Sequence, residues 1–85
     1  MRVTVIPVDR FIRCDNRSAH LPEWPFEDDS IHAIQWYEDH GEVELEGVPK
    51  PPNEPITDEA VVQPYVDALD AYLAEQATFT EPPAT

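Results

Sequence analysis

Hydrophobic and polar residues alternate through the first half of this sequence, in the way that half-buried β-strands require. Residues 2–8 are rich in β-branched side chains, and extended character resumes at residues 11–14 after a polar pair, which together predict a hairpin. Residues 31–37 give the strongest strand signal. In the segment that follows, Val43 and Leu45 alternate with glutamates. We therefore expect a small antiparallel β-meander of about four strands.

The segments between these strands carry their own signals. Residues 15–18 are typical of a turn. Residues 19–30 combine prolines and acids with Trp24 and Phe26, so we expect an ordered loop that its aromatic side chains hold in place and whose acids face water. Gly41 follows the strongest strand in a short turn, where a positive φ angle would require glycine.

The second half of the chain predicts a helix. Four prolines within residues 48–56 favour an extended crossover from the sheet to that helix. Thr57 stands at the position of an N-cap, with two acids directly after it. Pro64 leaves two alternatives, a short turn over residues 58–62 before a helix that starts with Pro64, or one helix with a kink.

Apolar residues at helical spacing support the helix in both alternatives. They recur every three or four positions and predict one buried face: Val62, Val66, Leu69 and Leu73. Two prolines near the end of the sequence predict a disordered tail. We therefore expect an α+β fold with an antiparallel β module, a proline-rich crossover, a C-terminal helix and a tail, at residues 1–47, 48–56, 57–77 and 78–85.

The charge limits the partners that such a fold can bind. The 85 residues include 18 acids against five Lys and Arg, which gives a formal net charge of −13. Residues 1–22 are weakly basic, whereas residues 23–85 hold a single cation, Lys50. Because this charge repels phosphate groups, we expect no nucleic acid and no anionic membrane as a partner. No segment reaches the roughly 18 apolar residues of a membrane-spanning helix.

Candidate catalytic and metal-binding residues are few. Cys14, Asp15 and His20 could be a nucleophile, its orienting group and its base, but a lone cysteine on a strand is more often a small apolar core residue. His20, His32 and His40 lack the close pairs that zinc-binding motifs use. We therefore expect neither an enzyme nor a protein with a cofactor or metal ion. With one cysteine there is no intrachain disulfide, which is typical of a cytosolic protein.

Aromatic residues are numerous for so short a chain. A sheet and one helix of this size cannot bury all of them well, so we expect a partner protein to cover some of them, with packing in the protein's own core as the alternative. The expected partner-binding residues lie on the strongest strand and on the helix: Trp36, Tyr37, Tyr65, Val66, Leu69, Tyr72 and Leu73.

A row of acids on one strand suggests a second hypothesis. Glu42, Glu44 and Glu46 are spaced by two, so they would share one face of the sheet and could imitate the phosphates of DNA. An acidic DNA mimic would inhibit a host nuclease or a restriction or CRISPR defence complex. The same row can also simply keep a sheet soluble.

Several strings of residues resemble those of small tail-fibre assembly or tail-fibre-associated proteins of tailed bacteriophages. They are the opening MRVTVIPVDR at residues 1–10, HAIQW at 32–36, GEVE at 41–44, PNEPI at 52–56 and VDA at 66–68. Their order and spacing carry the resemblance, because none of them contains a catalytic motif.

The resemblance implies an N-terminal β module followed by a helix, and a non-enzymatic protein that binds the tail fibre. Such a protein acts as an assembly factor (chaperone) in the host cytoplasm, or it is a small component of the virion tail. Because tail fibres are commonly trimeric, the resemblance also implies several copies on one fibre or a homo-oligomer.

Overall fold

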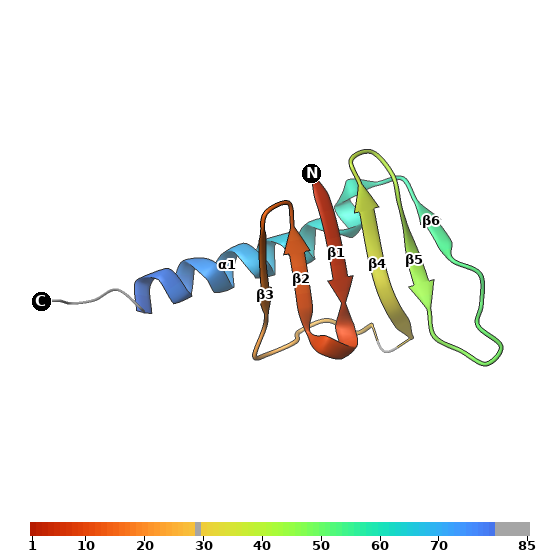
Figure 1. The fold of residues 1–85 in the computed structure, drawn as a ribbon, viewed down its shortest axis with the longest axis horizontal. Helices are drawn as coiled ribbons and strands as arrows, with labels where there is room; N and C mark the ends of the chain where they lie inside the picture. The colour runs from red at the N-terminus through yellow and green to blue at the C-terminus, as the bar shows by residue number, and fades with distance from the viewer. Residues whose placement is uncertain (29, 80–85) are drawn as a thin grey trace, which may run out of the picture.

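The computed structural model describes residues 1–28 and 30–79, which form an antiparallel sheet with an α-helix behind it (Figure 1). The strands are β1 (Arg2–Ile6), β2 (Phe11–Cys14), β3 (Arg17–His20), β4 (Ile31–Tyr37), β5 (Gly41–Leu45) and β6 (Glu54–Ile56). The helical elements are the 3₁₀ turns η1 (Pro7–Asp9) and η2 (Glu59–Val61) and the helix α1 (Gln63–Phe79). The expected α+β class, with an antiparallel sheet and a C-terminal helix, is confirmed.

The sheet consists of two three-stranded meanders that meet at β1 and β4. The strand order is β3-β2-β1-β4-β5-β6, and all neighbours are antiparallel. Val5 lies opposite Ile12 on one side and opposite Ile34 on the other, so these three side chains share one face. That face is the one on which the core is built, because all three are buried.

The sheet has six strands, so the expectation of about four is wrong. The two missed strands, β3 and β6, are the edges of the sheet. Only Asp15 and Asn16 connect β2 with β3, so the predicted turn over residues 15–18 is shorter than expected. In β6, Pro55 lies within the predicted crossover, and an edge strand tolerates proline because one side of its backbone has no partner.

Gly41 is required for a different reason from the one expected. It is the first residue of β5, and the positive φ angle of this turn belongs to Glu38, at 95°. A Cβ atom at Gly41 would overlap the carbonyl oxygen of Gln35 and lie 2.9 Å from Cα of Trp36. Glycine therefore allows β4 and β5 to approach closely.

The helical region begins with η2 and continues as α1, which agrees with the first of the two alternatives for Pro64. Pro64 is the second residue of α1, where its missing N–H has no partner to lose. Asp58, rather than Thr57, caps the preceding 3₁₀ turn, and its carboxylate accepts a hydrogen bond of 2.9 Å from the backbone N–H of Ala60. Of the predicted tail, residues 80–85 lie outside the described residues.

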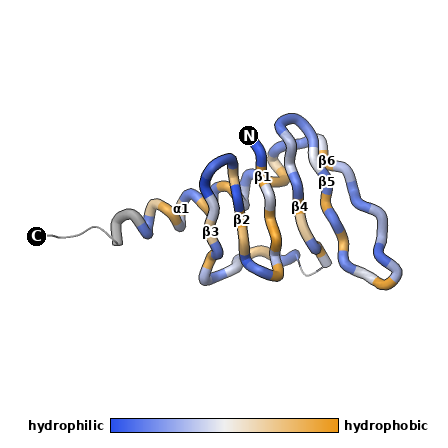
Figure 2. Tube along the Cα trace, in the orientation of Figure 1, coloured by the Kyte–Doolittle hydropathy of each residue, from blue (hydrophilic) through white to orange (hydrophobic). Residues whose placement is uncertain are grey.

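The core lies between the sheet and α1. Val62, Val66 and Leu69 are buried, as the helical spacing predicts, and Leu73 is half-buried against the same cluster. Along the strands, hydrophobic residues alternate with hydrophilic ones, whereas the connecting segments are mostly hydrophilic (Figure 2). Cys14 is buried in this core, so it packs as a small apolar side chain.

The helix α1 crosses behind the N-terminal meander and runs past its edge strand β3 (Figure 1). An ion pair fixes the crossing point: Nε and Nη2 of Arg17 donate to the two carboxylate oxygens of Asp70 at 2.6 and 3.2 Å. None of the described elements covers the opposite face of the sheet. No helix among the described residues is long and apolar enough to cross a membrane.

Candidate protein-binding site

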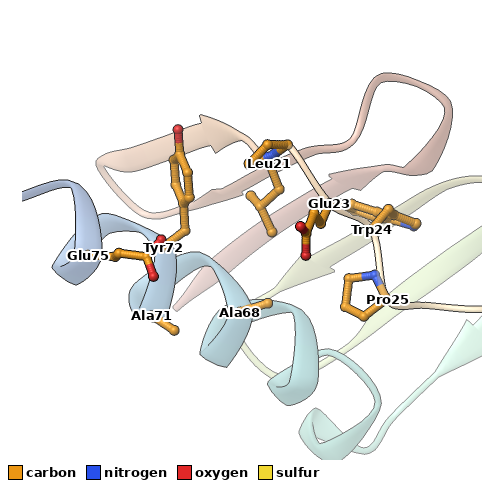
Figure 3. Close-up of a pocket in the computed structure, with 9 residues that line it drawn as sticks. Leu21, Glu23, Trp24, Pro25, Ala68, Ala71, Tyr72 and Glu75 are labelled. Atoms are coloured by element: carbon orange, nitrogen blue, oxygen red, sulfur yellow. The ribbon is translucent and has the colours of Figure 1, made fainter. Parts of the chain in front are cut away.

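An open groove of about 610 Å³ lies between the segment that follows β3 and one side of α1 (Figure 3). It is lined by Leu21, Pro22, Glu23, Trp24, Pro25, Ala68, Ala71, Tyr72 and Glu75. The small side chains of Ala68 and Ala71 leave the surface of the helix open, and the rings of Trp24 and Tyr72 supply the aromatic surface. Its volume is in the range of about 300–1,000 Å³ that is usual for ligand pockets.

A buried carboxylate holds one wall of the groove in place. The indole Nε1 of Trp24 donates to both oxygens of Asp28, at 3.1 and 3.2 Å, and the hydroxyl of Tyr65 donates to Oδ2 at 3.1 Å. Asp28 is only 7% exposed. Because Tyr65 belongs to the first turn of α1, these bonds join the segment after β3 to the helix.

Aromatic contacts support the same wall. The ring centroids of Phe26 and Tyr65 lie 4.2 Å apart, and those of Trp24 and Phe26 lie 5.1 Å apart in an edge-to-face arrangement. Such pairs add stability beyond their buried area. Aromatic side chains therefore hold this segment in place, as expected, and the groove is preformed. Two parts of the expectation are wrong: residues 19 and 20 belong to β3, and Asp28 is buried instead of facing water.

The environment of Tyr65 makes stability depend on pH in the alkaline range. Burial, followed by the negative charge of Asp28 and the hydrogen bond to it, raises the pKa of the Tyr65 hydroxyl well above its usual value of about 10. Above pH 10 the unfolded chain loses this proton while the folded protein keeps it. Stability from this group is therefore fully present below pH 10 and is lost as the pH rises further.

We predict that the free energy of unfolding falls above pH 10 more steeply in the wild type than in Tyr65→Phe. The difference in slope should be at most about 1.4 kcal/mol per pH unit, the value for one proton. Urea unfolding at pH 8, 10 and 11 measures it. Tyr72→Phe is the matched control, because Tyr72 is only half-buried. Equal slopes for the wild type and Tyr65→Phe would contradict the assignment.

The charges around the groove have one sign. Glu23 and Glu75 are both exposed, and within residues 1–28 and 30–79 neither carboxylate has a hydrogen bond or an ion pair. Among the residues that the structure describes, no Lys or Arg lines the groove. By contrast, Asp70 on the same helix is bound by Arg17, which lowers the pKa of Asp70. The groove thus combines aromatic surface with two unpaired carboxylates.

The residues that the sequence predicts for partner binding do not form one surface. Four are buried in the core: Trp36, Tyr65, Val66 and Leu69. The other three are half-buried. Tyr72 lines the groove and Leu73 packs against the core, whereas Tyr37 belongs to the uncovered face of the sheet. Trp24 is a site residue that the sequence pattern did not predict, although the two prolines near this tryptophan were a usable signal.

The predicted row of three glutamates is interrupted. Glu42 and Glu44 lie on the uncovered face, but Glu42 accepts a hydrogen bond of 3.1 Å from Asn53. Glu46 lies beyond the end of β5, with its carboxylate 2.9 Å from Nδ1 of His32. Arg2 lies on the same uncovered face, so this face carries both positive and negative charge.

The structure brings together only two of the three candidate catalytic residues: the thiol of Cys14 donates to Oδ2 of Asp15 at 4.0 Å, whereas His20 lies apart from both. Cys14 faces the core, and burial raises the pKa of its thiol, which is the opposite of activation. His20 pairs with Phe11 in the ladder and so lies on the other face of the sheet. Within the described part of the chain, no group of three His, Cys, Asp or Glu residues could hold a metal ion.

Comparisons with protein-family models, with curated proteins and with solved structures found no match to this chain.

Proposed function

We propose that this protein is a non-enzymatic binding protein of a bacteriophage tail fibre, and that the groove between the segment after β3 and α1 binds the fibre. It would act as an assembly factor or as a small component of the virion tail. The observation that carries the proposal is the preformed wall of the groove, which Asp28 ties to α1. The resemblance of its short sequence strings to tail-fibre-associated proteins names the partner.

The composition of the groove supports the binding of a protein. Trp24 and Tyr72 are half-buried, so each keeps ring surface that a partner can cover. Tryptophan and tyrosine are the residue types that most often dominate binding energy at interfaces. Because this wall is already ordered in the free protein, binding of a partner costs less conformational entropy.

Co-purification with a candidate fibre tests the proposal. We predict that Tyr72→Ala weakens the complex by a factor of about 30 or more, because a dominant interface residue contributes about 2 kcal/mol or more. Tyr37→Ala is the matched control, since it removes a half-buried tyrosine from the uncovered face. The wild-type complex should persist in 0.5 M NaCl, because apolar contacts are not screened by salt.

The same experiment separates the proposal from the DNA-mimic alternative. If Tyr72→Ala leaves the fibre complex intact, the groove is not the fibre-binding site. Reversing the charges of Glu42 and Glu44 to Lys tests the alternative. Binding to a nuclease or defence complex that these reversals abolish, while Tyr72→Ala has no effect, would favour the mimic.

A further inference from the structure

We propose that the segment that binds in the groove is extended and cationic, with apolar residues against Trp24 and Tyr72 and a Lys or Arg side chain between Glu23 and Glu75. This inference rests on the proposed function and names the chemistry of the fibre segment. Glu23 comes from the segment after β3 and Glu75 from α1, so the two carboxylates belong to opposite walls (Figure 3).

Charge complementarity argues for a cation in the bound segment. The two carboxylates are unpaired within the described residues, so a cation would displace no existing partner. α1 contains no Lys or Arg from Gln63 to Phe79, and its other acids are already engaged: Asp67 accepts a hydrogen bond of 2.9 Å from Gln63, and Asp70 pairs with Arg17. A cation of the partner is therefore attracted to Glu23 and Glu75, and α1 has no cation of its own that could occupy the same place.

The shape argues for an extended segment. Ala68 and Ala71 leave the helix surface low between the two aromatic rings, so a backbone can approach closely. Pro22 and Pro25 stiffen the facing wall. Extended, proline-rich segments bind in grooves lined by aromatic rings, because such segments lose little entropy on binding.

The probe is the synthetic peptide Val-Pro-Lys-Pro-Pro, acetylated and amidated, which combines apolar residues with one cation. We expect it to shift the indole N–H signal of Trp24 in NMR titrations, while the signal of Trp36, which is 2% exposed, stays unchanged. The same peptide with Glu in place of Lys should bind at least tenfold more weakly. In the variant Glu23→Gln/Glu75→Gln the two peptides should bind equally. Asp67→Asn, which neutralises an acid of α1 outside the groove, should preserve the difference.

Equal binding of both peptides to the wild type, or no binding of either, would overturn this inference. The proposed function would survive that outcome if Tyr72→Ala still disrupts the fibre complex. The alternative occupant is a second copy, because the sequence of this peptide is that of residues 48–52, where Val48 is fully exposed and Lys50 is the cation. A shift of the Trp24 signal with protein concentration alone, abolished by Lys50→Ala, would assign the groove to self-association and overturn the assignment to the fibre.

Discussion

Leu69→Ala is expected to lower the free energy of unfolding by about 2–5 kcal/mol, the range for a leucine that is deleted from a close-packed core. Leu69 is fully buried, at 0% exposure, among the residues of the central cluster. A domain of this size has only about 5–15 kcal/mol of stability in total, so the substitution should remove a large share of it and lower the melting temperature. Urea denaturation followed by circular dichroism measures the loss.

Leu73→Ala is the matched control, since Leu73 lies one turn further along α1 and is only half-buried. Its cost should be clearly smaller than that of Leu69→Ala. The Leu69→Ala variant also distinguishes core packing from partner binding, because the sequence alone predicts Leu69 as a partner-binding residue. A Leu69→Ala protein that keeps wild-type stability and yet loses the fibre would show that Leu69 binds the partner directly and would contradict the core assignment.

Asp28→Ala is expected to cost a similar amount, roughly 2–5 kcal/mol, for a different reason. The substitution leaves two donors without an acceptor, the partly buried indole N–H of Trp24 and the buried hydroxyl of Tyr65. Each unsatisfied donor costs about 1–3 kcal/mol. The wall of the groove should also become mobile, so the amides of residues 23, 24, 26 and 27 should exchange with deuterium faster than in the wild type.

A double-mutant cycle isolates this interaction. In a Trp24→Phe/Tyr65→Phe background both donors are absent, so Asp28→Ala should cost much less than in the wild type. Asp28→Asn keeps an acceptor oxygen and should cost less than Asp28→Ala in the wild type. Equal costs for Asp28→Ala in both backgrounds would show that the buried carboxylate does not act through these two bonds.

The central strands could be predicted from the sequence because their residues carry the signal themselves. The predicted strand at residues 31–37 coincides with β4, and alternating apolar residues mark Val43 and its neighbours. β3 could not be predicted in this way, because Arg17–His20 contains no β-branched residue and is a strand only through its pairing with β2. β6 could not be predicted for another reason, because it has only three residues and the middle one is a proline.

The candidate site was predictable only in part. Helical spacing identifies a stripe of apolar residues, but it cannot say which members face the sheet and which face a partner. Leu69 and Val66 turned out to be core residues, whereas Tyr72 lines the groove. The opposite wall depends on Asp28 meeting Tyr65, which is 37 residues away in the chain. A contact of that separation leaves no local pattern in the sequence.

The position of α1 also has a consequence for the order of folding. The helix follows β6 in the chain, yet it packs on β2 and β3, which both lie within the first twenty residues. The contact between Arg17 and Asp70 spans 53 residues, whereas each meander closes through short connections. Because the entropy of loop closure opposes non-local contacts, we infer that docking of the helix is the slow step and that both meanders form first.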